Sequence, residues 1–136
     1  MSHQATGFLN TIDGALKVVD RFGYWPSFHD AEILRIELTR NGLSTVEVYC
    51  YEGSRQKGQG SEFVITKDAI ILFLIEGISD LKLEGFSHQN VIFDFVITVV
   101  PDGFRLELED TFGIGGYLEC ANLKVDLKEA TDVPRS

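Results

Sequence analysis

Several features are scarce in this chain of 136 residues, and each scarcity argues against a class of protein. The two cysteines, Cys50 and Cys120, form no CxxC pair, so neither a disulfide framework nor a cysteine zinc motif is indicated. Lys and Arg number 12 against 21 Asp and Glu, a formal net charge of −9 that disfavours a nucleic-acid-binding surface. The longest apolar run, residues 69–75, is far shorter than the ~20 residues of a membrane-spanning helix.

Recognisable catalytic and ligand motifs are also scarce. His3, His29 and His88 stand in no HxH, HxxxH or HxxE arrangement, and no GxSxG sequence is present. The Gly-rich polar stretch 52–61 predicts a flexible loop and matches no phosphate-binding pattern. Cys50 and Cys120 fall on apolar faces of predicted strands, which favours buried, inert thiols. The sequence therefore predicts neither a metal nor a cofactor.

The length of the chain and its hydrophobic fraction of 44% predict one folded domain over residues 1–136. Residues 1–7 and 130–136 are polar and are expected to be loose ends. Residues 1–10 contain neither the basic region nor the apolar run of a secretory signal. We therefore expect a cytoplasmic protein with reduced thiols.

A helix is predicted near the N-terminus, over residues 9–21. Apolar residues recur there at spacings of three and four, as on one face of an amphipathic helix, at Leu9, Ile12, Leu16, Val19 and Phe22. Asn10 is a candidate cap for its start, and Gly23 a candidate for its end.

Strands are predicted for the rest of the chain. Residues 31–39 alternate with a period of two, Asn41-Gly42 predicts a two-residue hairpin turn, and residues 43–51 form the return strand. Several β-rich runs follow in 62–86, of which residues 69–77 fit a buried strand or a short helix, with strand favoured. Further strands are predicted at 90–100, 104–109 and 117–127, with turns at 101–103 and 113–116.

Alternation also predicts which side chains point inward. In residues 90–100, Phe93 is placed on one face with Phe95 and Ile97. In residues 117–127 the inward set changes near Ala121, which indicates a bulge or a twist. The predicted fold is α+β, with one N-terminal helix packed on a curved, mainly antiparallel β-sheet of six to eight strands.

The segment 22–32, FGYWPSFHDAE, combines the only Trp with a His-Asp pair. A His beside a carboxylate can act as a general base or a metal ligand. Adjacent side chains on an extended chain point to opposite sides, so Asp30 is not expected to orient the imidazole of His29. A structural turn is favoured, in which Pro26 sets the bend and Ser27 and Asp30 bond to local backbone. A partner contact and catalysis stay open.

A candidate acidic face is made of Glu107, Glu109 and Asp110. It is either a solvated sheet surface or a docking surface. Exposed aromatic side chains beside it would favour docking, and Tyr24 and Trp25 are the natural anchors. Burial of Trp25 against the helix is the equally plausible alternative.

A family resemblance runs from about residue 22 to 128. The segments FGYWPSFHDAEIL, ILFLIEGISDLKLEGF, QNVIFDFVI and GYLECANLKV, with the Asn-Gly turn, resemble the immunity protein 50 family of bacterial polymorphic toxin systems. This resemblance implies a small cytoplasmic protein that binds and neutralises a cognate toxin domain, without enzyme activity or cofactor. The motif residues that match are Trp25, Pro26, Ser27, Phe28, His29, Asp30 and Glu32.

Three hypotheses follow. The first is an immunity protein that binds its toxin through an acidic surface, and the negative charge agrees with a basic nuclease as that toxin. The second is a small enzyme, or a ligand- or metal-binding domain, that uses His29 and Asp30, with His88 as a further ligand in a metal site. The third is a structural subunit or adaptor. The sequence indicates no oligomeric state.

Overall fold

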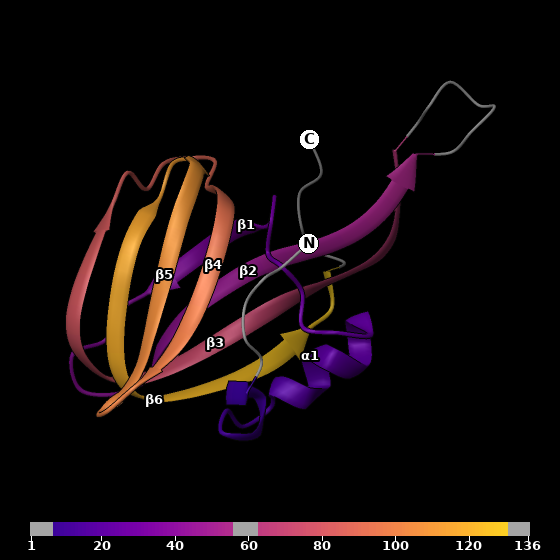
Figure 1. Ribbon diagram of the computed structural model, residues 1–136. Helices are drawn as coiled ribbons and strands as arrows, with labels where there is room; N and C mark the ends of the chain where they lie inside the picture. The colour runs from indigo at the N-terminus through magenta and orange to yellow at the C-terminus, as the bar shows by residue number, and fades with distance from the viewer. Residues whose placement is uncertain (1–6, 56–62, 131–136) are drawn as a thin grey trace.

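The computed structural model describes residues 7–55 and 63–130. Over these residues the chain forms a short 3-10 helix, Gly7–Asn10, one α-helix, α1 (Ala15–Phe22), and six strands. The strands are β1 (Glu32–Glu37), β2 (Ser44–Arg55), β3 (Phe63–Glu84), β4 (Val91–Val100), β5 (Gly103–Phe112) and β6 (Gly115–Lys128). They pair antiparallel in the order β1-β2-β3-β6-β5-β4 and close into a barrel (Figure 1). The predicted α+β fold, a helix packed on a curved antiparallel sheet, is confirmed.

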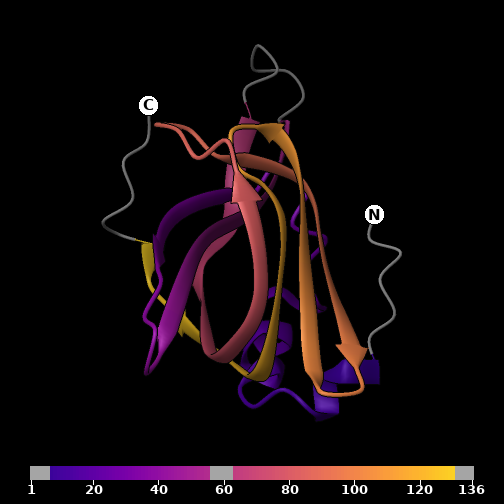
Figure 2. The ribbon, with the colours of Figure 1, turned by 90° about the vertical axis from the view of Figure 1, so that its left-hand side faces the viewer.

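Strand β3 is one continuous element of 22 residues where the sequence predicted several runs. Its long curve carries it from pairing with β2 to pairing with β6 around the barrel (Figure 2). The strand assignment of residues 69–77 is confirmed. At Gly77, where φ is +70°, an added Cβ would lie 2.9 Å from the Cβ of Ala121, so only Gly fits this bend without displacement. Beside it, the buried residues of β6 change from Leu118 and Cys120 to Leu123 and Val125, as predicted near Ala121.

The helix is shorter than the predicted 9–21, because a tertiary contact interrupts it. Asp13 forms a parallel bridge with Lys124, and its carbonyl oxygen accepts a hydrogen bond of 2.8 Å from the amide of Val125. This pairing covers the edge of β6 that β5 leaves free. Asn10 therefore ends the 3-10 helix instead of capping α1. The predicted end at Gly23 is confirmed by its left-handed φ of 89°.

The later start also changes the buried face of the helix. Ala15, Val18 and Phe22 are buried, whereas Leu16, which the periodicity placed in the core, is 58% exposed. The three buried residues join the apolar cluster that fills the barrel, to which every strand contributes. The helix is thus held by burial of one narrow stripe, the usual source of stability for so short a helix.

Several boundaries differ from the sequence prediction. The β1–β2 connection spans residues 38–43 instead of a two-residue turn, and the hydroxyl of Ser44 accepts a hydrogen bond from the amide of Thr39. Strand β2 continues through residues 52–55, and β6 begins at Gly115. The rest of the predicted loop, 56–62, and most of the predicted loose ends lie outside the described residues. Ala130, however, is buried and packs with Tyr49 and Ile70.

No helix in the described part of the chain is long and apolar enough to cross a membrane.

Candidate functional site

The Trp-Pro-Ser-Phe-His-Asp segment leads from α1 into the strand that closes the barrel. Trp25 and Phe28 are 5% and 1% exposed, and their rings meet edge to face with centroids 5.6 Å apart. Phe28 also lies 5.1 Å from the ring of Phe95 and 6.0 Å from that of Phe73. Trp25 is therefore a core residue. Of the two alternatives that the sequence left open, burial is correct and an exposed anchor is not.

Backbone hydrogen bonds from this segment join β1 to β4. The amide of Asp30 donates to the carbonyl of Ile92, and the amide of Ile92 donates to the carbonyl of Ala31, each at 2.9 Å. The amide of Ile33 donates to the carbonyl of Asn90 at 2.8 Å. Together with the buried rings, these bonds close the barrel. The motif that carries the family resemblance thus has a structural role in this fold.

The side chains of His29 and Asp30 stay outside, each about half exposed. Their nearest atoms, His29 Nε2 and Asp30 Oδ2, lie 3.7 Å apart. The expectation that they point to opposite sides is wrong, because the chain is not extended here. Phe28 and Asp30 have φ values of 64° and 67°, in the left-handed region that bulky residues rarely adopt. The resulting turn brings the two side chains together.

The other ring nitrogen of His29 is also engaged. Its Nδ1 lies 3.1 Å from the carbonyl oxygen of Phe93, an arrangement in which Nδ1–H donates. The hydroxyl of Ser27 accepts a hydrogen bond of 3.2 Å from the amide of His29, so the predicted local turn is present for Ser27. Nε2 is left as the nitrogen that can take up a proton, next to Asp30.

Tyr24 and Glu32 flank this turn. Tyr24 is 52% exposed, and its hydroxyl donates a hydrogen bond to the carboxylate of Glu52. Glu32 is partly buried and opposes Tyr49 in the β1–β2 ladder. Burial raises the pKa of Tyr51, and the charges of Asp30, Cys50 and Glu32 raise it further. The carboxylates of Asp30 and Glu32 are therefore close enough to act on the same side chain.

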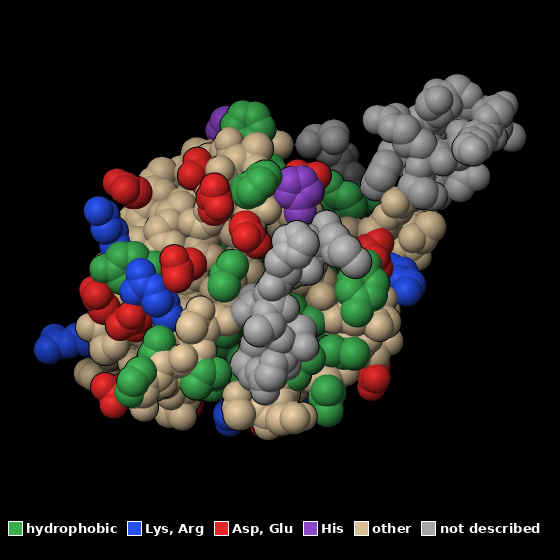
Figure 3. Space-filling model, viewed as in Figure 1, with side chains coloured by type: hydrophobic (Ala, Val, Ile, Leu, Met, Phe, Trp, Pro, Cys, Tyr) green, Lys and Arg blue, Asp and Glu red, His purple; other side chains and the backbone are tan. Residues whose placement is uncertain are grey.

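The candidate acidic face divides into two parts. Glu107 is bound by Arg105, whose Nε lies 3.2 Å from it, and Arg105 also contacts Glu119 at 2.7 Å. Glu109 and Asp110 have no ion pair among the residues that the structure describes. Figure 3 shows acidic and hydrophobic side chains, with some Lys and Arg side chains, intermingled on the face over β4 and β5.

Sequence reasoning missed a bulge in β4 that changes this face. Phe93 has no partner in the β4–β5 register, which shifts between Val91 and Ile92 and again between Ile92 and Asp94. Its side chain is 49% exposed. The prediction that Phe93 shares a face with Phe95 and Ile97 is thus wrong, because Phe95 and Ile97 are buried together with Ile92, whereas Phe93 is exposed. Asp94, opposite Glu109, joins the acidic face as a result. Alternation alone cannot reveal a bulge, because an extra residue breaks the period.

In the described residues both cysteines are buried, and the histidines belong to no metal-binding group. Burial raises the pKa of Cys50 to about 12 and that of Cys120 to about 11, so both thiols are protonated at neutral pH. Within residues 7–55 and 63–130, no three His, Cys, Asp or Glu side chains are placed to hold a metal ion. The tertiary site of His29, Asp30 and His88 that the sequence left open is therefore not formed.

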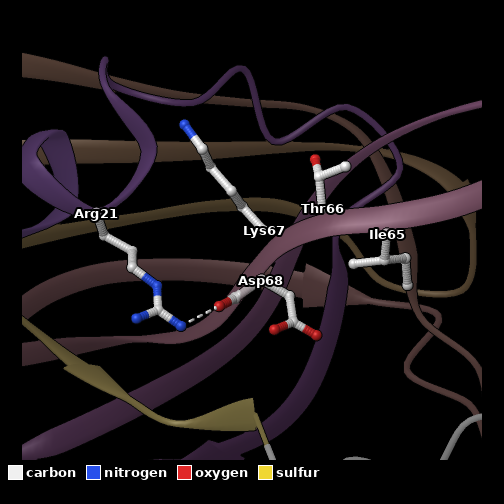
Figure 4. Close-up of a pocket in the computed structure, with 5 residues that line it drawn as sticks. All are labelled: Arg21, Ile65, Thr66, Lys67 and Asp68. Atoms are coloured by element: carbon white, nitrogen blue, oxygen red, sulfur yellow. Dashed lines mark hydrogen bonds between the residues drawn. The ribbon is translucent and has the colours of Figure 1, made fainter.

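Two open depressions lie elsewhere on the molecule. One, of about 520 Å³, is lined by Arg21, Ile65, Thr66, Lys67 and Asp68 (Figure 4). Its cations are engaged within the chain, since Arg21 donates to the carbonyl of Asp68 at 2.8 Å and Lys67 to that of Phe22 at 3.1 Å. The other, of about 710 Å³, lies beside the start of α1 and the end of β6. Neither includes His29 or Asp30.

Comparison of the chain with models of known protein families, with curated proteins and with solved structures found no match.

Proposed function

We propose that this protein is an immunity protein, which binds a cognate toxin domain and neutralises it without catalysis. The observation that carries this proposal is the outer face of β4 and β5, where the paired residues Asp94 and Glu109 have no ion pair in the described part of the chain. The resemblance of residues 22–128 to the immunity protein 50 family supports the same function. The proposed compartment is the cytoplasm, where a toxin must be blocked.

Charge gives this proposal a physical mechanism. A protein with a formal net charge of −9 is attracted to a basic surface, such as the cleft of a nuclease. Complementary charge accelerates association and fixes the orientation of the partners, and salt weakens both effects. An immunity protein benefits from fast association, because it must occupy the toxin before the toxin reaches its target.

The contact between His29 and Asp30 supports a second candidate, a small enzyme or ligand-binding domain. Nε2 of His29 is available for a proton, and Asp30 lies 3.7 Å away. Both side chains are about half exposed, however. A catalytic base works best in a site from which water is excluded. The third candidate, a structural subunit or adaptor, has no specific observation in its favour.

The experiment is co-expression with the toxin domain encoded beside this protein, followed by co-purification at low and high salt. We expect growth to be rescued and a stable complex whose affinity falls as salt is raised. His29→Ala separates the two candidates when rescue and co-purification are compared, because loss of a catalytic base would abolish rescue and leave the complex intact, whereas loss of a docking contact would weaken both together. Failure of the wild-type protein to rescue growth and to form a complex would overturn the immunity function.

A further inference from the structure

Exposed apolar side chains gather where the β4 bulge meets the His29 turn. The ring of Phe93 is 49% exposed and stands against the ring of His29, with centroids 5.1 Å apart. Phe112 is 58% exposed and opposes Val91 across the β4–β5 ladder. Val91 lies two residues before Phe93 on β4. Cross-strand and diagonal neighbours on one face lie within reach of aromatic side chains. We call the four residues His29, Val91, Phe93 and Phe112 the Phe93 patch.

Four carboxylates border the Phe93 patch. Asp30 contacts His29, Glu32 opposes Val91 across the β1–β4 pair, and Asp94 follows Phe93 and opposes Glu109. None of the four forms an ion pair with a Lys or Arg among the described residues. This differs from the neighbouring part of the sheet, where Arg105 pairs with both Glu107 and Glu119.

The arrangement has the composition of a protein interface. Interface cores are enriched in aromatic residues, and the surrounding rim is polar and able to pair with charges on the partner. Large exposed aromatic side chains cost solubility, so a cluster of them on one small protein indicates a surface that is covered in a complex. The bulge at Phe93 is the local device that turns this ring outward.

The carboxylates around the Phe93 patch determine which kind of partner can bind there. A second copy of this chain, docked by a two-fold axis through the patch, would bring the same carboxylates together, and like charges repel. Anionic nucleic acid and lipid head groups are disfavoured for the same reason. A basic protein surface is complementary, with Lys or Arg facing the carboxylates and an apolar centre facing the two phenylalanines.

We propose that the Phe93 patch is the docking surface for the toxin domain, and that the toxin contacts it with Lys and Arg side chains around an apolar centre. This inference rests on the proposed function, because it takes the occupant to be the toxin. Phe93 and Phe112 supply the desolvated contact. Asp30, Glu32, Asp94 and Glu109 supply the charge that orients the partner.

The test measures binding of the catalytically inactivated toxin domain encoded beside this protein. Two double variants probe the patch, Phe93→Ala with Phe112→Ala for the apolar contact and Asp94→Asn with Glu109→Gln for the charge. Matched controls lie elsewhere, namely Leu16→Ala on α1, also exposed, and Glu76→Gln on β3, opposite the neutral Asn122. Melting of each variant is recorded first. Asp94→Asn keeps an acceptor for the amide of Phe95 and removes a cross-strand repulsion, so this variant is expected to fold.

We expect the aromatic variant to bind at least about tenfold more weakly, mainly through faster dissociation. The charge variant should associate more slowly and lose much of the salt dependence of binding. Both controls should bind within about twofold of wild type. Wild-type binding that both patch variants retain in full would overturn this inference and leave the proposed function standing. Absence of binding by the wild-type protein itself would overturn both.

Discussion

The imidazole of His29 is held by the residue that forms the β4 bulge. Its Nδ1 lies 3.1 Å from the carbonyl oxygen of Phe93, and its ring stands at 84° to the ring of Phe93. The bulge frees this carbonyl from the β4–β5 ladder, so the turn after Phe28 and the irregularity in β4 complete each other. The exposed side chain of His29 thus connects the turn that closes the barrel to the bulge on the outer face of β4.

Replacement of His29 by Ala should have little effect on folding. The side chain is 52% exposed, and water can take the place of its hydrogen bond to the Phe93 carbonyl. We expect the free energy of unfolding to fall by less than about 1 kcal/mol. Urea unfolding of His29→Ala, beside His88→Ala as a second exposed histidine, measures this. A loss of more than about 2 kcal/mol would mean that the imidazole belongs to a structural network.

Trp25 and Tyr24 should differ strongly, although they are adjacent in sequence. Trp25 is 5% exposed in the core, whereas Tyr24 is 52% exposed and makes a hydrogen bond to Glu52. Trp25→Ala should cost about 3–5 kcal/mol through loss of burial and formation of a cavity. Tyr24→Ala should cost about 0.5–1.5 kcal/mol, the contribution of an ordinary hydrogen bond. Unfolding of both variants is followed by circular dichroism, because Trp25→Ala removes the only tryptophan and with it the fluorescence signal. Equal melting temperatures for the two variants would refute the placement of Trp25 in the core and Tyr24 at the surface.

Gly14 and Gly23 form a matched pair at the two ends of α1. Their φ values are 88° and 89°, so an Ala side chain is conformationally strained to the same degree at both. At Gly14 the added Cβ would lie 1.7 Å from the carbonyl oxygen of Val125, whereas at Gly23 the nearest atom is Lys67 Nζ at 3.9 Å. Gly23→Ala should therefore cost only about 1 kcal/mol.

Gly14→Ala should cost several times more, because the chain must move away from β6 to make room. Thermal melting of the two variants, with the helical circular dichroism signal, gives the comparison. Equal destabilisation by the two substitutions would show that the close approach between Gly14 and Val125 is absent in solution.

The sequence predicts a feature of this fold where contacts between residues close in sequence determine it, and fails where tertiary contacts determine it. Alternation in residues 104–108 predicts the inward face of β5, and Gly23 ends the helix through a hydrogen bond to Val19, four residues away. The start of the helix is set instead by Val125, more than a hundred residues further along. No pattern in residues 9–14 contains that information. The closure of the barrel between Asp30 and Ile92 is equally non-local.

The candidate site shows the same division. Its composition identified residues 22–32, and local turn chemistry predicted that Ser27 bonds to nearby backbone, which it does at the amide of His29. The left-handed φ values of Phe28 and Asp30 are not predictable from local sequence, because they accompany tertiary contacts, namely burial of the Phe28 ring and the hydrogen bond from the Asp30 amide to Ile92. The proximity of His29 to Asp30 and the exposure of Phe93 both follow from such irregular backbone.

Tyr117 gives a prediction in the alkaline range. Its hydroxyl donates a hydrogen bond of 3.1 Å to Asp80, and this bond, with the charge of Asp80, raises the pKa of Tyr117 above its ordinary value. The folded protein therefore holds this proton more tightly than the unfolded chain does. The resulting stabilisation is complete below the unfolded-state pKa of about 10 and is lost as the pH rises through the folded-state pKa. The group is only partly buried, so the effect on stability is small.

Titration rather than melting is the sensitive measurement for this pair. Tyrosinate absorbance is followed against pH for the wild type and Asp80→Asn, with Tyr117→Phe to identify the signal. Asp80→Asn should lower the pKa of Tyr117, because a neutral amide does not repel the phenolate. The pKa of Tyr51, which is raised mainly by burial, should not change and serves as the internal control. Identical titration curves for the wild type and Asp80→Asn would show that the hydrogen bond between Tyr117 and Asp80 does not persist in solution.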